Sequence, residues 1–161
     1  MKSIVCNAGP LIALAGIGRT GLLRELFGEV LVSGKVRDEV EAGGKTGTAA
    51  SLFADSPWIR VIRLTERPDP LLETLLDRGE AETIALAMQS SAGLILMDER
   101  KGRRIAREIY GFAVVGTGRV LIEAKKSGLI PAVRPLIDQM RDHGYWLSDR
   151  IVAEILRQAE E

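Results

Sequence analysis

The sequence predicts an α/β fold of three layers, α/β/α, in which helices cover both faces of a central, mostly parallel sheet. Three observations indicate this fold. Short apolar runs recur along the chain, segments with helical spacing separate most of them, and glycine or proline marks many of the boundaries. Crossovers that contain helices are typical of parallel sheets, whereas antiparallel hairpins are joined by short turns.

The first half of the chain is predicted to alternate between strands and helices. Pro10 can open a helix, because proline is favoured in the first turn, and Ser33 can cap another. Pro68 and Pro70 mark a break, and Gly43–Gly47 is predicted to be a flexible loop. We expect strands over residues 3–6, 30–32 and 58–64, and helices from residue 10, near 22–26, through 36–40 and over 49–54.

The second half has a more regular pattern. We expect strands over residues 94–97 and 112–115, and helices over 79–88, 99–110, 117–126, 131–140 and 149–159. The 161 residues suit one compact domain, 1–161, in which residues 129–161 would form a C-terminal helical extension.

Composition excludes several classes of protein. The 22 basic residues balance 22 acidic ones, which excludes a globally basic nucleic-acid binder but leaves room for a local basic patch. Aromatic residues make up only 4%, which argues against a platform of exposed rings for single-stranded bases. One cysteine and one histidine exclude a disulfide framework and any site rich in those residues. Without a membrane-length apolar run or a signal-peptide pattern, we expect a soluble cytoplasmic protein with no membrane partner.

Two glycine-rich segments match phosphate-binding motifs only in part. Gly16–Gly21 fits the dinucleotide fingerprint by letter, but a helical segment stands where a strand is required, which favours a turn between helices. Gly44-Lys45-Thr46 ends like a phosphate-binding loop, yet Glu39 stands where the first glycine would be. We also expect Cys6 to be a buried, inert thiol and His143 to lie at a solvated helix end.

Polar residues follow three predicted strands at the edge where parallel sheets bind ligands. Asn7 follows the first strand, Asp98 the strand over 94–97, and Thr117 comes shortly after the strand over 112–115. Glu39 and Glu80, on predicted helices, can join them.

If these side chains converge, the site holds three carboxylates and one amide. Two carboxylates about 5 Å apart repel by roughly 3 kcal/mol at an effective dielectric of about 20, so such a cluster takes up protons or binds a cation. Oxygen ligands without histidine or thiolate favour Mg²⁺ or Mn²⁺, and these ions suit phosphoryl chemistry.

Each of these residues also has a purely structural interpretation. Asp98 could cap the following helix, and Glu80 could face the helix dipole from the first turn. Glu39 could be a solvated charge, and Asn7 could simply tolerate a turn.

A basic helix follows directly after Asp98. Its arginines at i, i+3, i+4 and i+7 share one helical face. They are Arg100, Arg103, Arg104 and Arg107. With Thr117 they are candidate contacts for RNA phosphates, and the alternative is a solvated face paired with Glu99 and Glu108.

Several segments, in this order and spacing, resemble PIN-domain proteins. The opening run Ile4–Leu14, which reads Ile-Val-Cys-Asn-Ala-Gly-Pro-Leu-Ile-Ala-Leu, is similar to the start of that family. The likeness continues at Leu26–Val30, Val36–Val40, Gly79–Glu82 and Met97–Arg104. Gly128-Leu129-Ile130-Pro131 and the two helices after it are similar to the C-terminal extension of one prokaryotic subfamily.

The resemblance implies a metal-dependent endoribonuclease of the toxin–antitoxin type, using Mg²⁺ or Mn²⁺. It assigns metal binding to Asn7, Glu39, Glu80 and Asp98. Glu80 and Asp98 would hold the ion, and Glu39 would assist them and orient the attacking water. RNA is the implied substrate, and a cognate antitoxin and a homodimer are the implied protein partners.

Asn7 departs from the family pattern, because many members have a metal-binding aspartate at this position. An amide ligates without charge, so divalent-ion binding should be weaker. The alternative is therefore a catalytically impaired PIN-like domain that binds RNA or a protein. A third reading is a nucleotide-binding module that uses the turn Gly16–Gly21.

Overall fold

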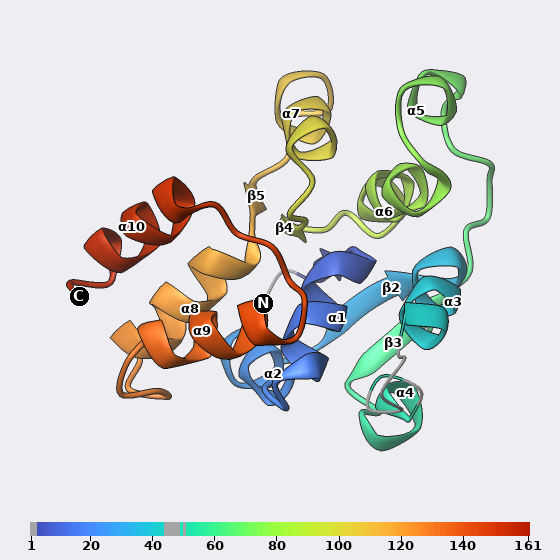
Figure 1. The fold of residues 1–161 in the computed structure, drawn as a ribbon. Coiled ribbons are helices and arrows are strands. Elements are labelled where there is room, and N and C mark those ends of the chain that lie inside the picture. Colours follow the sequence, from blue (N-terminus) through green and yellow to red (C-terminus); the bar gives the residue numbers. More distant parts are fainter. Residues whose placement is uncertain (1–2, 44–48, 50) are drawn as a thin grey trace.

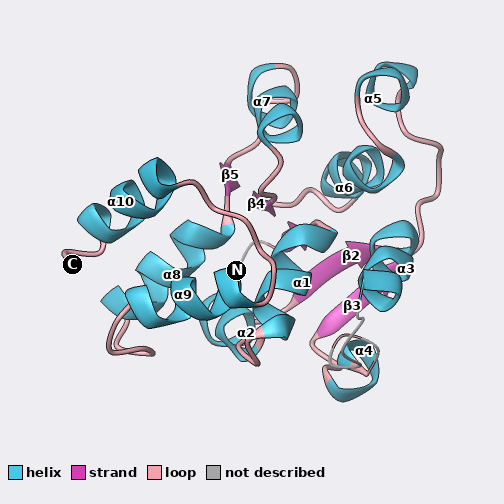
Figure 2. Ribbon diagram, viewed as in Figure 1, coloured by secondary structure: helices cyan, strands magenta, loops and turns pink. Residues whose placement is uncertain are grey.

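The computed structural model describes residues 3–43, 49 and 51–161. Within these residues five strands form one sheet in the order β3-β2-β1-β4-β5, and every pairing is parallel (Figures 1 and 2). The strands are β1 (Ile4–Cys6), β2 (Val30–Ser33), β3 (Ile59–Ile62), β4 (Leu94–Leu96) and β5 (Val114–Val115). The predicted α/β class with a parallel sheet is confirmed.

The strand order reverses beside β1. Ile4 of β1 pairs with Val30 of β2 on one side and with Leu94 of β4 on the other. The chain therefore builds the sheet outward through β2 and β3, and then returns across β1 to add β4 and β5. In open parallel sheets, ligands bind beyond the carboxyl ends of the strands at such a reversal. Asn7 and Asp98 lie at this point, directly beyond β1 and close beyond β4.

Alternate residues of each strand enter two separate apolar cores, which makes the fold three-layered. Cys6, Val32 and Leu96 face one core, whereas Leu31 and Ile95 face the other. The first core contains side chains of α1 (Ala8–Gly16), α2 (Gly21–Phe27), α3 (Gly34–Gly43), α4 (Leu52–Asp55), α8 (Thr117–Lys126), α9 (Arg134–Asp142) and α10 (Asp149–Gln158). The second contains those of α5 (Pro70–Leu75), α6 (Arg78–Gln89) and α7 (Arg100–Glu108).

The two C-terminal helices are part of the first core. Ile137 and Met140 of α9 and Leu156 of α10 are almost completely buried there, in the same cluster as Ile4 and Cys6 of β1. Because these helices share a core with the central strand, the connection between them is held close to the sheet. Figure 1 shows this connection passing below β4 and β5 in that view, across the segment that leads from β5 to α8.

One helix was not predicted, and the bounds of several elements differ from expectation. The break predicted at Pro70 is the start of α5, because the Asp69 side chain accepts a hydrogen bond from Leu71 N at 2.9 Å and caps the helix. Helix α1 begins at Ala8, ahead of Pro10. The predicted cap at Ser33 is confirmed, since its Oγ accepts from Val36 N at 3.1 Å.

The alternative motifs have structural explanations. Helix α1 ends at Gly16 and α2 begins at Gly21, so this segment is the predicted turn between helices and not a dinucleotide fingerprint. Cys6 is completely buried, and His143 is an exposed residue at the end of α9. Gly44-Lys45-Thr46 and most of the predicted loop Gly43–Gly47 lie outside the described residues. No helix in the described part of the chain is both long and apolar enough to cross a membrane.

Candidate active site

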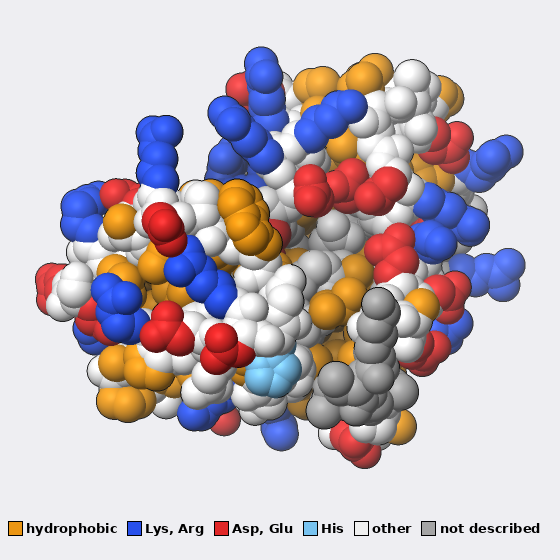
Figure 3. Space-filling model, viewed as in Figure 1, with side chains coloured by type: hydrophobic (Ala, Val, Ile, Leu, Met, Phe, Trp, Pro, Cys, Tyr) orange, Lys and Arg blue, Asp and Glu red, His pale blue; other side chains and the backbone are white. Residues whose placement is uncertain are grey.

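A cleft of about 1050 Å³ lies beyond the carboxyl ends of β1, β4 and β5, and all four predicted metal-site residues line it. Asn7, Glu39, Glu80 and Asp98 therefore reach one hollow from four different elements or their ends. Further acidic and basic side chains line the same cleft, namely Asp77, Glu99, Glu154, Arg100, Arg103, Arg107 and Arg119. Figure 3 shows basic side chains gathered over α7 and acidic ones beside them towards α6 and α3.

Asn7 is fixed where β1 and β4 end together. Its backbone N–H donates to Leu96 O at 2.9 Å, and its side chain is 7% exposed. It occupies the N-cap position of α1 but makes no capping hydrogen bond with its side chain. The Thr83 hydroxyl donates to Gly79 O at 2.7 Å and lies 3.4 Å from Asn7 Oδ1. The amide is thus directed across the sheet edge towards α6 and is not used to cap its own helix.

Asp98 accepts three hydrogen bonds. Thr117 donates its backbone N–H to Oδ1 and its hydroxyl to Oδ2, each at 2.7 Å, and the Tyr145 hydroxyl also donates to Oδ2. The N-cap of α7 is Glu99, so the interpretation of Asp98 as that cap is wrong. The close approach of Gly116 is also necessary, because a Cβ there would lie 2.9 Å from Asp98 Oδ1.

Tyr145 is a site residue that the sequence did not predict. It lies on the connection between α9 and α10, 47 residues from Asp98, and no local pattern marks it. Burial raises the pKa of the Tyr145 hydroxyl, and the neighbouring Asp98 charge raises it further. The hydroxyl therefore keeps its proton and acts as a donor to the carboxylate.

Glu80 has a structural role and also lines the cleft. It is the third residue of α6, where its N–H donates to Asp77 Oδ1 at 2.8 Å and its Oε2 accepts from Asp77 N at 3.2 Å. This reciprocal capping box explains why the sequence places a glutamate here. Burial raises the pKa of Glu80, and the charges of Asp77, Glu99 and Glu39 raise it further. Glu80 therefore caps α6 and also presents a carboxyl group to the cleft.

Glu39 approaches the first turn of α6 from α3. Its carboxylate lies over Gly79, where an added Cβ would be 2.6 Å from Oε1 and 2.7 Å from Oε2. Burial raises the pKa of Glu39, and Asp77 raises it further, while Lys35 acts in the opposite direction. Glu39 and Glu80 are thus two carboxyl groups whose ionised forms are disfavoured by the protein around them, which a bound cation would relieve.

We expect Gly79→Ala to displace Glu39 without unfolding the protein. The clash falls on the end of a flexible side chain, and alanine in this first turn of α6 lowers the conformational entropy of the unfolded chain relative to glycine. The melting temperature should stay the same or rise, while any activity or cation affinity that depends on Glu39 should fall several-fold. Thermal unfolding measures the melting temperature, and Mn²⁺ titration of the same preparation measures the cation affinity. A large loss of stability would contradict the expectation.

The predicted arginine face is divided between the cleft and the solvent. Arg100, Arg103 and Arg107 line the cleft, whereas Arg104 pairs with Glu108 at 3.1 Å on the exposed surface, as the solvated alternative expected. Arg103 is half-buried. Burial lowers the pKa of its guanidinium most, the charge of Arg107 lowers this pKa further, and the charge of Asp98 acts in the opposite direction. Thr117 uses its hydroxyl on Asp98.

A family model described as a PIN domain matches residues 3–161. The chain belongs to the PIN-domain family. No match is found among the curated proteins. The fold of this PIN domain is of the nuclease type, and PIN domains generally depend on divalent metal ions.

The residues of this PIN domain fit a divalent cation in kind and in charge. Carboxylate and amide oxygens are the ligands that Mg²⁺ and Mn²⁺ prefer. In the described part of the chain, no three acidic, histidine or cysteine side chains stand close enough to hold one ion directly. Mg²⁺ usually binds through one or two carboxylates and keeps several waters, so a pair such as Glu80 and Asp98 suffices in number.

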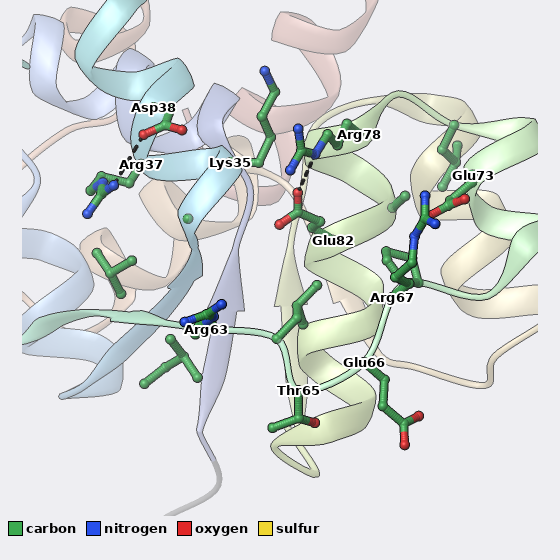
Figure 4. Close-up of a pocket in the computed structure, with 17 residues that line it drawn as sticks. Lys35, Arg37, Asp38, Arg63, Thr65, Glu66, Arg67, Glu73, Arg78 and Glu82 are labelled. Carbon is green, nitrogen blue, oxygen red and sulfur yellow. Dashed lines mark hydrogen bonds and ion pairs between the residues drawn. The ribbon is translucent and has the colours of Figure 1, made fainter.

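A second hollow of the PIN domain, of about 1020 Å³, lies beyond β2 and β3 (Figure 4). Six of the nine charged side chains that line it form ion pairs with one another. Arg78 binds Glu82 at 3.1 Å, and the other pairs are Arg37 with Asp38 and Arg67 with Glu73. None of the predicted metal-site residues lines it. The cleft around Asp98 is therefore the candidate active site.

Proposed function

We propose that this PIN-domain protein is an endoribonuclease that hydrolyses RNA phosphodiester bonds with the help of Mg²⁺ or Mn²⁺. One observation carries the proposal. Asn7, Glu39, Glu80 and Asp98 line a single cleft at the point where the strand order reverses, and arginines line the same cleft. Acidic oxygens suit a cation, and the arginines suit the phosphates of the substrate.

Each residue then has a distinct task. Glu80 and Asp98 would hold the ion, while Asn7 adds an uncharged oxygen. A bound ion would supply an activated water and would neutralise charge on the scissile phosphate. Glu39 would assist in holding the ion and orient the attacking water.

The neighbouring residues keep this set in place. Thr117 and Tyr145 fix the orientation of Asp98 through three hydrogen bonds. Arg100 and Arg103 would bind the phosphates that flank the bond to be cut.

Cleavage of a single-stranded RNA by the purified protein tests the proposal, and α6 offers a matched pair of variants. Glu80→Gln removes a charge at the cleft but keeps a residue that can complete the capping box. Glu82→Gln removes a charge from the same helix, where Glu82 pairs with Arg78 and lines the other hollow. We expect cleavage with Mn²⁺, its loss with a chelator, and a fall of about a hundredfold in Glu80→Gln only.

Equal rates for wild type and Glu80→Gln, or cleavage that persists in excess chelator, would contradict this function. The melting temperatures of both variants, compared with that of the wild type, show whether a lower cleavage rate results from unfolding of the variant.

A second candidate is a PIN domain that binds RNA without cutting it. Two features favour it, since Asn7 lacks the charge of an aspartate and Asp98 already accepts three hydrogen bonds. Binding of RNA by a wild-type protein that does not cleave it would favour this candidate over the nuclease.

The toxin–antitoxin role extends the proposal to partners. As the toxin of such a pair, the protein would act as a homodimer and be held inactive by a cognate antitoxin. Sedimentation analysis measures the oligomeric state, and a growth defect on expression, relieved by a neighbouring gene product, would support the toxin role.

A further inference from the structure

Trp146 is 80% exposed, more than any other large apolar side chain in the described part of the chain. The next most exposed are Ile109 at 52% and Met88 at 50%. Burying an aromatic ring of this size is strongly favourable, and this exposed ring borders a cleft, which makes it a candidate for ligand contact.

The backbone on both sides of Trp146 is anchored. Tyr145 binds Asp98 through its hydroxyl and donates its N–H to Met140 O at 2.9 Å. On the other side, Leu147 O accepts from Arg141 Nη2 at 2.6 Å. Tyr145 and Leu147 also pack against the first core. Both neighbours of Trp146 are thus held by the protein, so the ring is presented outward from a fixed position.

The ring borders two hollows at once. It lines the cleft that contains Asp98, and it also lines a smaller hollow of about 440 Å³ formed by the α9–α10 connection. Arg103 and Arg119 line the cleft with it. Within the described residues Arg103 forms no ion pair, whereas Arg119 binds Glu123 at 2.7 Å. An aromatic face beside cations in one cleft suits a ligand with flat rings and negative charges.

We propose that Trp146 stacks on a nucleobase of single-stranded RNA whose neighbouring phosphates lie against the cleft arginines. This deepens the proposed function, on which it rests. Every base has a π-face, and single strands leave that face open for an aromatic side chain. A protein partner would also cover the ring. Acidic side chains line the cleft as well, but the basic ones are gathered over α7, apart from the acidic ones towards α6 and α3, and this basic part of the cleft favours a polyanion (Figure 3). The inference concerns one ring beside the site, not the multi-ring platform that the low aromatic content argues against.

Fluorescence reports on this ring directly, because the chain has two tryptophans. In a Trp58→Phe background, Trp146 is the remaining indole, and a short single-stranded RNA is titrated in the presence of a chelator so that no cleavage occurs. We expect quenching on binding. Trp146→Ala should weaken binding by about 5- to 150-fold, the range that corresponds to the loss of one stacked base, and Trp146→Phe should retain most of the affinity. Affinities of the alanine variants are measured by anisotropy of labelled RNA.

Two controls separate stacking from other effects. An RNA of the same length with abasic sites keeps the phosphates but offers no ring, so Trp146→Ala should not change its affinity. Met88→Ala removes another exposed apolar side chain, one that does not line the cleft, and should bind like wild type.

Unchanged RNA affinity in Trp146→Ala, with no quenching of Trp146, overturns the proposal and indicates that a protein or a second copy covers the ring. The result is independent of the nuclease assay. Weaker binding in Trp146→Ala together with full cleavage by Glu80→Gln would retain the stacking residue and reject the proposed catalytic site. Normal RNA binding by Trp146→Ala together with loss of cleavage in Glu80→Gln would reject the stacking role of Trp146 and support the proposed catalytic site.

Discussion

Asp98→Asn is expected to lower RNA cleavage by about a thousandfold while the protein stays folded. The substitution removes the charge that Thr117 and Tyr145 hold in position in the cleft. Loss of a charge that acts on a metal ion or a developing transition state costs about 10²- to 10³-fold in rate. Cleavage rates at saturating Mn²⁺ measure the effect.

The fold should tolerate this change at a cost of about 1–2 kcal/mol. The asparagine oxygen can still accept from Thr117 N, and both hydroxyl groups can rotate to accept from the new amide. The cost arises because the two hydroxyl hydrogens lose the carboxylate oxygen that accepted them. Asp138→Asn, on an exposed position of α9, is the matched control for charge and should leave the rate unchanged. A rate for Asp98→Asn within threefold of wild type would remove Asp98 from the catalytic set.

Asn7→Asp is expected to raise the affinity for Mn²⁺ at least tenfold and to lower the stability of the metal-free protein. Residue 7 is 7% exposed and lies where β1 and β4 end together, so the new carboxylate enters a cleft that already holds three acidic side chains of the candidate metal set. Carboxylates about 5 Å apart repel by roughly 3 kcal/mol at an effective dielectric of about 20, and a divalent cation reverses the sign of that interaction.

Melting curves with chelator and with Mn²⁺ separate the two effects. For a protein of this size 1 kcal/mol corresponds to about 2–4 °C, so the variant should melt several degrees below wild type in chelator and gain more from Mn²⁺. Cleavage should rise in parallel if Asn7 limits activity. Equal Mn²⁺ affinity in wild type and variant would show that residue 7 is not a ligand.

The central part of the site follows from the sequence because parallel strands end at the same edge of a sheet. Asn7 and Asp98 each follow a short apolar strand, which places both at that edge. They lie together because β1 and β4 are neighbours, and the strand pattern alone does not fix that order. Glu80 could be placed in the first turn of a predicted helix, and the structure shows that it also completes a capping box there. Glu39 joins them because α3 packs against α6. The sequence predicted that Glu39 lies on a helix, but it did not predict which element that helix packs against.

The contacts of Asp98 could not be predicted, because they depend on how distant segments pack. Tyr145 reaches Asp98 from a connection whose path is set by the burial of α9 and α10. The arginine pattern fixes which residues share a face of α7, but not how the helix is rotated on the sheet, so Arg104 faces solvent and Arg103 faces the cleft. Helix α5 was missed because proline both breaks a helix and starts one, and only the cap at Asp69 distinguishes the two.

The predictions for Asp98→Asn and Asn7→Asp both require that the cleft around Asp98 binds a divalent cation. Electron paramagnetic resonance of Mn²⁺ added to the metal-free protein tests this requirement most directly. The account predicts binding at a site that depends on the cleft carboxylates. Affinity should fall at least tenfold in Asp98→Asn and in Glu80→Gln and change far less in Glu82→Gln, because Glu82 lines the other hollow and its charge is a minor influence on Glu39. Absence of binding in the wild type, or binding that survives in Asp98→Asn and Glu80→Gln, would contradict a metal-dependent active site in this cleft.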